Sequence, residues 1–307
     1  MKATVFKSTG SWYNLKAENG NWYQGRIRGV LKLDGITSTN PAAVGDRVEM
    51  TIEDELAATA IITEILDRRN YINRQSPRHK HQHHIIAANL DQSVLVATLR
   101  EPRTSAGFID RFLVASEMYH VSAIIVFNKS DLYRSKEEEQ YERWKEIYEK
   151  AGYRCIRCSA ESGEGIGELQ QQLKDKVSLF SGHSGVGKST LLNKILPGLD
   201  LRTRDVSGWS GKGMHTTTFA EMFELPGGGA IIDTPGMREF GLVDLDPTEL
   251  SHYFPEMRAY IGQCQFNNCI HINEPGCAVK KAASEGAISI ERFESYVTLL
   301  ASMQEKL

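Results

Sequence analysis

The chain lacks several features that mark secreted, membrane-bound or strongly nucleic-acid-binding proteins. No apolar run approaches the length needed to cross a membrane, and residues 1–7 have no signal-peptide core. The five cysteines are an odd number without obvious pairing, which suits a reducing compartment. With 36 basic and 39 acidic residues, the bulk charge implies no nucleic-acid partner. We therefore expect a cytoplasmic protein of two or three domains in 307 residues, with no membrane partner.

One segment has the sequence of a phosphate-binding loop, G-x-x-x-x-G-K-[ST]. An apolar run (177–180) precedes it and a helix-compatible segment (190–196) follows it, as this motif requires. The glycines let backbone N–H groups surround a phosphate at the N-terminus of a helix. We expect Lys188 to reach the β- and γ-phosphates and Ser189 to hold Mg²⁺. The residues expected to bind nucleotide here are Gly182, His183, Ser184, Gly185, Val186, Gly187, Lys188, Ser189 and Thr190.

A second motif, N-K-x-D, follows directly on an apolar strand (123–127). Ligands of open α/β sheets bind beyond the carboxyl ends of the strands, so this position suits a site. The Asp131 carboxylate can accept hydrogen bonds from guanine N1–H and N2–H₂, and adenine lacks that amino group. Asn128 would tie this loop to the phosphate loop, and the stem of Lys129 would cover the base. The motif therefore predicts GTP as the ligand, bound through Asn128, Lys129, Ser130 and Asp131.

The following strand and turn (155–160) would complete the base site. Here Ser159 and Ala160 form a loop whose Ala160 N–H would contact guanine O6. The C-x-x-C spacing of Cys155 and Cys158 also allows a redox or metal interpretation. Positions three apart in a strand point to opposite faces, which disfavours that interpretation.

Two later segments are expected to respond to the γ-phosphate. A polar loop (211–218) between helix and strand is a natural first switch, in which a threonine, with Thr217 as the candidate, would reach Mg²⁺. The spacing does not decide which threonine does so. A strand then leads into D-T-P-G (233–236), where Asp233 would hold Mg²⁺ through water and the Gly236 N–H would meet the γ-phosphate.

The catalytic residues are expected to be Lys188 and a group that positions water. Many GTPases place a glutamine after the last glycine of the second switch, but Met237 occupies that position and cannot form a strong hydrogen bond. We therefore expect slow intrinsic hydrolysis that a partner accelerates. His215 is the best internal candidate for positioning the water, and a plain loop role for His215 is equally open.

The order of these motifs differs from that of Ras-like proteins. The N-K-x-D and S-A loops precede the phosphate loop, and D-T-P-G comes last. Moving the termini of a fold to a surface loop preserves its core. Residues 90–240 therefore predict a circularly permuted, Ras-like α/β P-loop GTPase domain with helices on both faces of the sheet.

The regions before this domain predict a barrel and a basic linker. Residues 1–70 contain about five short strands, as in an OB-type β-barrel. Residues 71–89 form the linker and carry no acidic side chain, so they are either solvated or a flexible basic arm beside a phosphate-rich partner. Two interpretations of the barrel stay open, a filled core or a nucleic-acid-binding face, for its residues Trp12, Tyr13, Trp22, Tyr23, Arg26 and Arg28.

The C-terminal region (241–307) predicts a helical domain with one structural Zn²⁺. Its pattern C-x₄-C-x-H-x₅-C supplies three thiolates and one imidazole, which close a tetrahedral shell and leave no position for water. The expected zinc ligands are Cys264, Cys269, His271 and Cys277. In the last helix the apolar residues at helical spacing predict a packing face, with a partner-binding face as the alternative: Ile290, Phe293, Val297 and Leu300.

With these motifs and flanking domains, nearly the whole chain resembles the circularly permuted, small-ribosomal-subunit-dependent GTPases of the RsgA type. The resemblance implies Mg²⁺-dependent GTP hydrolysis stimulated by the small ribosomal subunit during its late maturation, with the barrel and zinc domain docked on rRNA. We expect a monomer. Two alternatives stay open: a nucleotide-gated RNA-binding assembly factor with negligible turnover, and a GTPase that acts on another RNA or protein.

Overall fold

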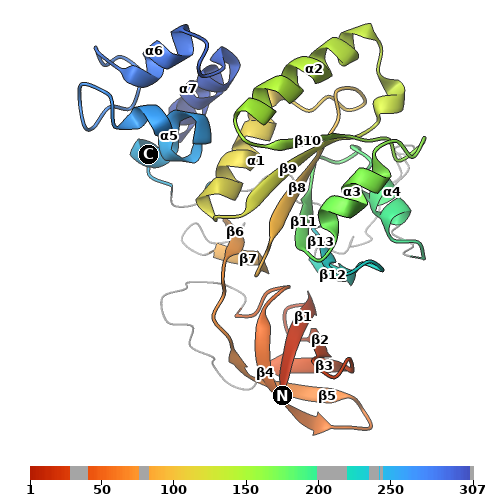
Figure 1. Ribbon diagram of the computed structural model, residues 1–307. Coiled ribbons are helices and arrows are strands. Elements are labelled where there is room, and N and C mark those ends of the chain that lie inside the picture. The colour runs from red at the N-terminus through yellow and green to blue at the C-terminus, as the bar shows by residue number, and fades with distance from the viewer. Residues whose placement is uncertain (28–40, 76–82, 199–219, 235–241, 243–244, 305–307) are drawn as a thin grey trace, which may run out of the picture.

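A computed structural model describes the chain except for residues 28–40, 76–82, 199–219, 235–241, 243–244 and 305–307. It has three parts, an N-terminal barrel, a central α/β unit and a C-terminal group of helices (Figure 1). Within the described part of the chain, no helix combines the length and apolar character needed to cross a bilayer.

The N-terminal part is a five-stranded closed barrel. Its strands are β1 (Lys2–Ser8), β2 (Tyr13–Ala17), β3 (Trp22–Ile27), β4 (Arg47–Asp54) and β5 (Thr59–Ile65). They pair in the order β1-β2-β3-β5-β4, and pairing of β1 with β4 closes the barrel. Alternate residues such as Val5, Leu15 and Val48 point inward and are fully buried, as the two-residue period of a strand requires. The predicted barrel is confirmed.

The segment predicted as a basic linker is partly a β-ribbon. Strands β6 (Tyr71–Gln75) and β7 (His83–Ala88) pair antiparallel, and the tip between them lies outside the described residues. Ile72 and Ile86 are 1% and 6% exposed, because the ribbon packs these side chains into the core of the α/β unit. The apolar run at the end of β7 supplies this burial, so the picture of a wholly flexible arm is wrong for these two strands.

The central unit is a mainly parallel sheet between two layers of helices. Its parallel strands are, in spatial order, β10 (Arg154–Arg157), β9 (Ser122–Phe127), β8 (Gln92–Ala97), β11 (Val177–Ser181) and β13 (Ala230–Asp233). Strand β12 (Glu221–Glu224) pairs antiparallel with β13, and a single pair, Lys7 with Glu221, continues the sheet into the barrel. One face packs against α1 (Ala106–Met118) and α2 (Ser135–Lys150), the other against α3 (Ile166–Leu173) and α4 (Lys188–Ile195).

The register of the parallel strands brings their carboxyl ends to one edge. Ala97 pairs with Phe127, and Phe127 pairs with Arg157. On the other side of β8, Phe180 pairs with Asp233. The loops that follow these strands carry the predicted motifs, so the permuted order still assembles them at one place, as expected for open α/β sheets.

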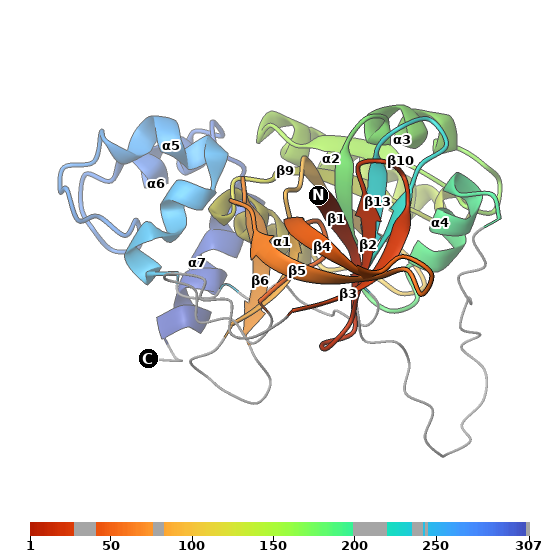
Figure 2. The ribbon, with the colours of Figure 1, turned by 90° about the horizontal axis from the view of Figure 1, so that it is seen from below.

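The C-terminal part is helical and packs beside α1 and α2 (Figures 1 and 2). Its elements are η2 (Pro247–Tyr253), α5 (Pro255–Ile261), α6 (Ala278–Ser284) and α7 (Ile290–Gln304). The packing face predicted for α7 is confirmed for Phe293, Val297 and Leu300, which pack in the core of this unit. It is wrong for Ile290, which is 53% exposed, and it omits Arg292, which is 1% exposed. The apolar pattern could not reveal this, since a charged residue is buried only when partners elsewhere in the chain compensate it.

Candidate functional site

The phosphate loop lies between β11 and α4, which begins at Lys188. Gly182 and Gly187 have φ angles of +155° and +84°. A Cβ atom at Gly182 would lie 2.5 Å from the Val96 carbonyl oxygen, and one at Gly187 would lie 2.6 Å from Asn128 Nδ2. Both positions therefore require glycine, for space as well as for conformation.

Asn128 joins the phosphate loop to the two loops predicted to bind the base. Its Nδ2 donates to the Val186 carbonyl oxygen at 2.8 Å, and its Oδ1 accepts from the Ala160 N–H at 3.2 Å. The side chain is 1% exposed. A buried amide that satisfies partners on two other loops fixes their separation, because leaving either group unpaired would be costly.

The predicted base-reading residues are held in place by neighbouring side chains. The Ser159 hydroxyl donates to the exposed Asp131 carboxylate, and Ser159 Oγ accepts from the Ser162 N–H at 3.0 Å. Lys129 has a left-handed backbone with φ of 65°, and its ammonium donates to the Glu101 carbonyl oxygen. Asp131 thus presents a hydrogen-bonded carboxylate at the surface, the acceptor that guanine recognition needs.

Next to the loop, Lys188 and Asp233 form a largely buried ion pair. Lys188 Nζ lies 2.9 Å from Asp233 Oδ1, and the two side chains are 13% and 7% exposed. Lys188 Nζ also donates to the Thr234 carbonyl oxygen at 3.3 Å. The cation, the carboxylate and the adjoining Ser189 are the donor set that a phosphate chain with Mg²⁺ uses. The chemistry of these residues therefore fits that group.

Three of the expected residues, His215, Thr217 and Gly236, lie outside the described residues, as does Met237. The structure therefore gives no position for the two expected switches beyond Asp233 and Thr234.

Two contacts of the phosphate loop were not anticipated from the sequence. The ring of Phe108, on α1, stacks on that of His183 with centroids 3.6 Å apart and an interplanar angle of 30°. Pro102 lies 3.4 Å from the position of a Cβ at Gly185. Both contacts join segments about 80 residues apart in the sequence, and no local pattern marks either residue as a neighbour of the loop.

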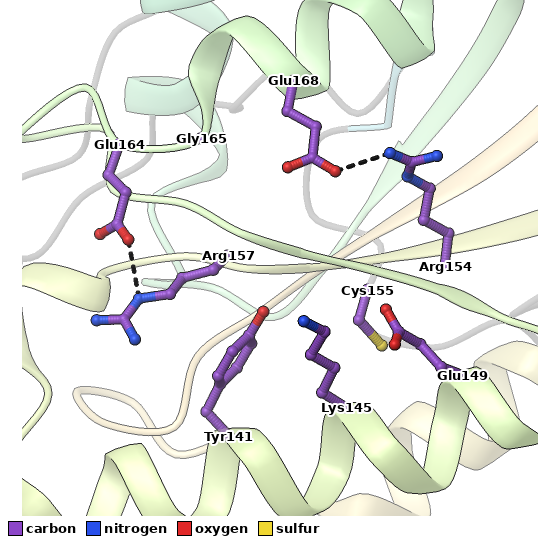
Figure 3. Close-up of a pocket in the computed structure, with 9 residues that line it drawn as sticks. All are labelled: Tyr141, Lys145, Glu149, Arg154, Cys155, Arg157, Glu164, Gly165 and Glu168. Atoms are coloured by element: carbon purple, nitrogen blue, oxygen red, sulfur yellow. Dashed lines mark hydrogen bonds and ion pairs between the residues drawn. The ribbon is translucent and has the colours of Figure 1, made fainter.

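A cavity of about 440 Å³ lies elsewhere, at the edge strand β10 between α2 and α3 (Figure 3). Ion pairs of Arg154 with Glu168 and of Arg157 with Glu164 cross it. Burial raises the pKa of the Cys155 thiol to about 12, so this cysteine stays protonated. Cys155 and Cys158 belong to the cores on opposite faces of the sheet, which agrees with the preference against a joint redox or metal site.

The four predicted zinc ligands converge, with all their ligand atoms within 4.8 Å of one another. Cys264 Sγ lies 3.9 Å from Cys277 Sγ and 3.6 Å from His271 Nδ1, which is 3.4 Å from Cys277 Sγ. A tetrahedral Zn²⁺ with ordinary bond lengths separates two sulfurs by about 3.8 Å and sulfur from nitrogen by about 3.5 Å. The cluster therefore fits zinc and identifies Nδ1 as the histidine ligand atom.

Burial favours uncharged ligands in this cluster. Desolvation raises the pKa of Cys269 to about 12 and lowers the pKa of His271. A central dication would reverse the effect on the thiol and would bind the neutral imidazole directly.

The aromatic residues of the barrel divide between its core and its surface. Tyr13 and Tyr23 are 2% and 5% exposed, whereas Trp12 and Trp22 are 43% and 49% exposed. The ammonium of Lys16 lies 5.7 Å from the ring centroid of Trp22. The candidate binding face is thus reduced to the two exposed tryptophans, because Lys16 is itself paired with Glu224. Arg26 is paired with Glu53 and Arg28 lies outside the described residues.

Comparison with known proteins covers nearly the whole chain. The RsgA GTPase family matches residues 65–243 and the RsgA N-terminal domain family matches residues 2–60. The chain is 50% identical over 305 residues to the small ribosomal subunit biogenesis GTPase RsgA of Bacteroides fragilis, covering 99% of this chain and 98% of that protein. The same-named protein of Cytophaga hutchinsonii is 51% identical over 300 residues, with 98% of each chain covered.

Two solved structures share the architecture. The crystal structure of YjeQ from Thermotoga maritima superposes with a TM-score of 0.80 at 34% identity, covering 99% of this chain and 98% of that one. YloQ, described as a circularly permuted GTPase, gives a TM-score of 0.76 at 26% identity, covering 100% and 96%. The chain therefore belongs to the RsgA family of circularly permuted GTPases and is itself a GTPase.

Proposed function

We propose that this GTPase hydrolyses GTP with Mg²⁺ during late maturation of the small ribosomal subunit, and that the subunit stimulates hydrolysis. The proposal is supported by relatives named as small ribosomal subunit biogenesis GTPases. The observation that carries the nucleotide part is the Asn128 bridge, because it holds the phosphate loop against both base loops. The protein would act as a cytoplasmic monomer, since its partner is a cytoplasmic particle.

Within this proposal, Asp131 selects guanine and the loop 182–190 surrounds the phosphates. Ser189 and Asp233 would hold Mg²⁺, which neutralises charge that develops on the phosphates. Lys188 would exchange Asp233 for the β- and γ-phosphate oxygens when nucleotide binds. The support for this step is the 2.9 Å ion pair, which holds the Lys188 ammonium beside Asp233.

Three residues of the two switches would contribute to the catalytic site. His215 would position the attacking water, Thr217 would act in the first switch, and the Gly236 N–H would meet the γ-phosphate. Because Met237 cannot orient water, the partner would complete the site.

The C-terminal cluster would hold one structural Zn²⁺ through Cys264, Cys269, His271 and Cys277. With four protein ligands the ion has no open position, so it would stabilise the loops of this unit and take no part in hydrolysis. The barrel and this unit would dock on rRNA.

The test of the proposal is GTP hydrolysis with and without purified small ribosomal subunits. We expect slow turnover of the isolated protein and at least tenfold stimulation by small, but not large, subunits. Equal slow rates with bound subunits would instead support a nucleotide-gated assembly factor with negligible turnover. No binding to small subunits would point to another RNA or protein partner.

Cosedimentation with small subunits tests the docking surface separately. Trp22→Ala should weaken binding about tenfold, because stacking of one base on an aromatic ring contributes about 1–3 kcal/mol. Leu56→Ala is the matched control, since Leu56 is also an exposed apolar residue of the barrel, 101% exposed at the β4–β5 turn. Equal effects of the two variants would contradict a specific stacking role for Trp22.

A further inference from the structure

Helix α1 contacts the phosphate loop in its first turn. Ser105 caps the helix, and its side chain accepts from the Phe108 N–H at 3.3 Å. This cap fixes the residue whose ring stacks on His183 at 3.6 Å. Because His183 is the second residue of the loop, part of the loop's position is set from outside it.

The same helix is joined to the C-terminal unit by a buried ion network. Asp110, two residues after Phe108, pairs with Arg292 of α7 at 2.6 Å, and both side chains are 1% exposed. Glu256 of α5 pairs with the same guanidinium at 2.6 Å. Buried ion pairs such as these tolerate little displacement, because moving the carboxylates away from the guanidinium would leave a buried charge without its partner. Helices α1, α5 and α7 are therefore held as one body.

The far end of α1 makes two more links. Glu117 pairs with Arg258 of α5, and Tyr119, just beyond the helix, donates to Asn73 in β6. The rings of Tyr71 and Tyr119 lie 6.0 Å apart. Figure 1 shows α1 between the β8–β9 side of the sheet and the C-terminal helices. One helix thus touches the phosphate loop, the C-terminal unit and the β6–β7 ribbon.

We propose that Phe108 is a positioning residue for the phosphate loop, and that α1 makes the loop's position depend on the C-terminal unit. Nucleotide bound at the loop would then restrain α7, and a partner bound to the C-terminal unit would change nucleotide affinity by the same factor, since such linkage is reciprocal. The inference rests on the proposed nucleotide-binding role of the loop.

Hydrogen–deuterium exchange of the full chain with and without GDP tests the restraint. GDP should slow exchange in α4 and also at least fivefold in α7, although none of the residues proposed to bind nucleotide lies in α7. Protection confined to α4 would overturn the coupling while leaving nucleotide binding intact. Absence of protection in both helices would refute nucleotide binding, and this inference with it.

Two matched phenylalanine variants test whether Phe108 connects the phosphate loop to α7. Phe108→Leu keeps most of the apolar volume but removes the stack on His183, so GDP should still protect α4 and lose its effect on α7. Phe293→Leu makes the same substitution within α7, where the Phe293 ring lies parallel to Tyr296 at a longer centroid distance of 6.2 Å and an angle of 29°. This control should raise the basal exchange of α7 but keep the GDP effect. Retention of the GDP effect in Phe108→Leu would contradict the role of Phe108.

The effect of the C-terminal unit on nucleotide binding is tested by two variants. Each breaks one ion pair between the C-terminal unit and the α/β unit. Arg258→Gln breaks the pair with Glu117 of α1, whereas Glu291→Gln breaks the pair with Arg143 of α2. We expect Arg258→Gln to change the dissociation rate of fluorescent GDP about threefold and Glu291→Gln to leave it unchanged. Equal effects would mean that α1 is not the connecting element.

Discussion

At the scale of single residues, the proposed nucleotide site depends on glycines, which leave space, as much as on polar side chains. Gly187 leaves room for the Asn128 amide, and that amide in turn holds Val186 and Ala160. The motif spacing predicts that these loops meet, because each follows a parallel strand. It does not predict the contacts of Phe108 with His183 or of Lys129 with Glu101, which depend on how one loop folds over another.

Gly187→Ala should reduce GDP affinity at least tenfold and lower the melting temperature. The added Cβ would lie 2.6 Å from Asn128 Nδ2, at a residue with φ of +84°, and a left-handed conformation alone costs alanine about 1–2 kcal/mol. Gly167→Ala is the control, since its Cβ would meet nothing within 4 Å inside α3. Differential scanning calorimetry and GDP titration should show the control unchanged or more stable. A Gly187→Ala protein that matches the control would contradict the packing described.

At the scale of elements, the apolar patterns predict the sheet and its helices well. The runs at 93–97 and 123–127 are central buried strands, and the charged helix expected near 135–150 is α2. The patterns fail where burial depends on distant partners. Among the described residues, Arg292 is the largest fully buried side chain, but its sequence neighbours give no sign of Asp110 or Glu256.

Arg292→Ala should destabilise the C-terminal unit by about 3–5 kcal/mol, because it leaves two carboxylates buried without a cation. Desolvation lowers the pKa of Arg292, but the carboxylates of Asp110 and Glu256 raise it by more. The guanidinium therefore stays charged. Arg143→Ala removes an exposed ion pair and should cost less than about 1 kcal/mol. Native-state hydrogen exchange of α7 measures both changes. Similar costs for the two variants would contradict the importance of the buried network.

Each chain should contain one zinc ion, and Cys264→Ala should lose it. A chelator should increase exchange in residues 264–277 while α1 stays protected, because the ion closes loops with little apolar content. Cys158→Ala is the control, since that cysteine lies in the core of the α/β unit. Atomic absorption that finds no zinc in the wild type, or equal zinc in the two variants, would contradict the assignment.

At the scale of the whole molecule, the central unit that carries the proposed nucleotide site contacts both flanking parts. The barrel joins the central sheet through the β1–β12 pair, and Lys16 forms an ion pair with Glu224 of β12. The C-terminal unit joins through α1 and α2. The sequence predicts three parts and their order. It could not predict these contacts, because each joins residues that are more than a hundred positions apart in the sequence.

The central claim is that the loops of this permuted chain form one guanine-specific site whose turnover the small ribosomal subunit stimulates. The most direct measurement compares GTP and xanthosine triphosphate hydrolysis by wild type and Asp131→Asn, with and without small subunits. The asparagine amide can donate to the carbonyl of xanthine but can no longer accept both guanine donors. We expect the variant to lose at least a hundredfold of stimulated GTP turnover and to gain stimulated turnover of xanthosine triphosphate. Unchanged GTP turnover in Asp131→Asn would contradict the base site. Equal GTP turnover of the wild type with and without small subunits would contradict the role of the subunit as the stimulating partner.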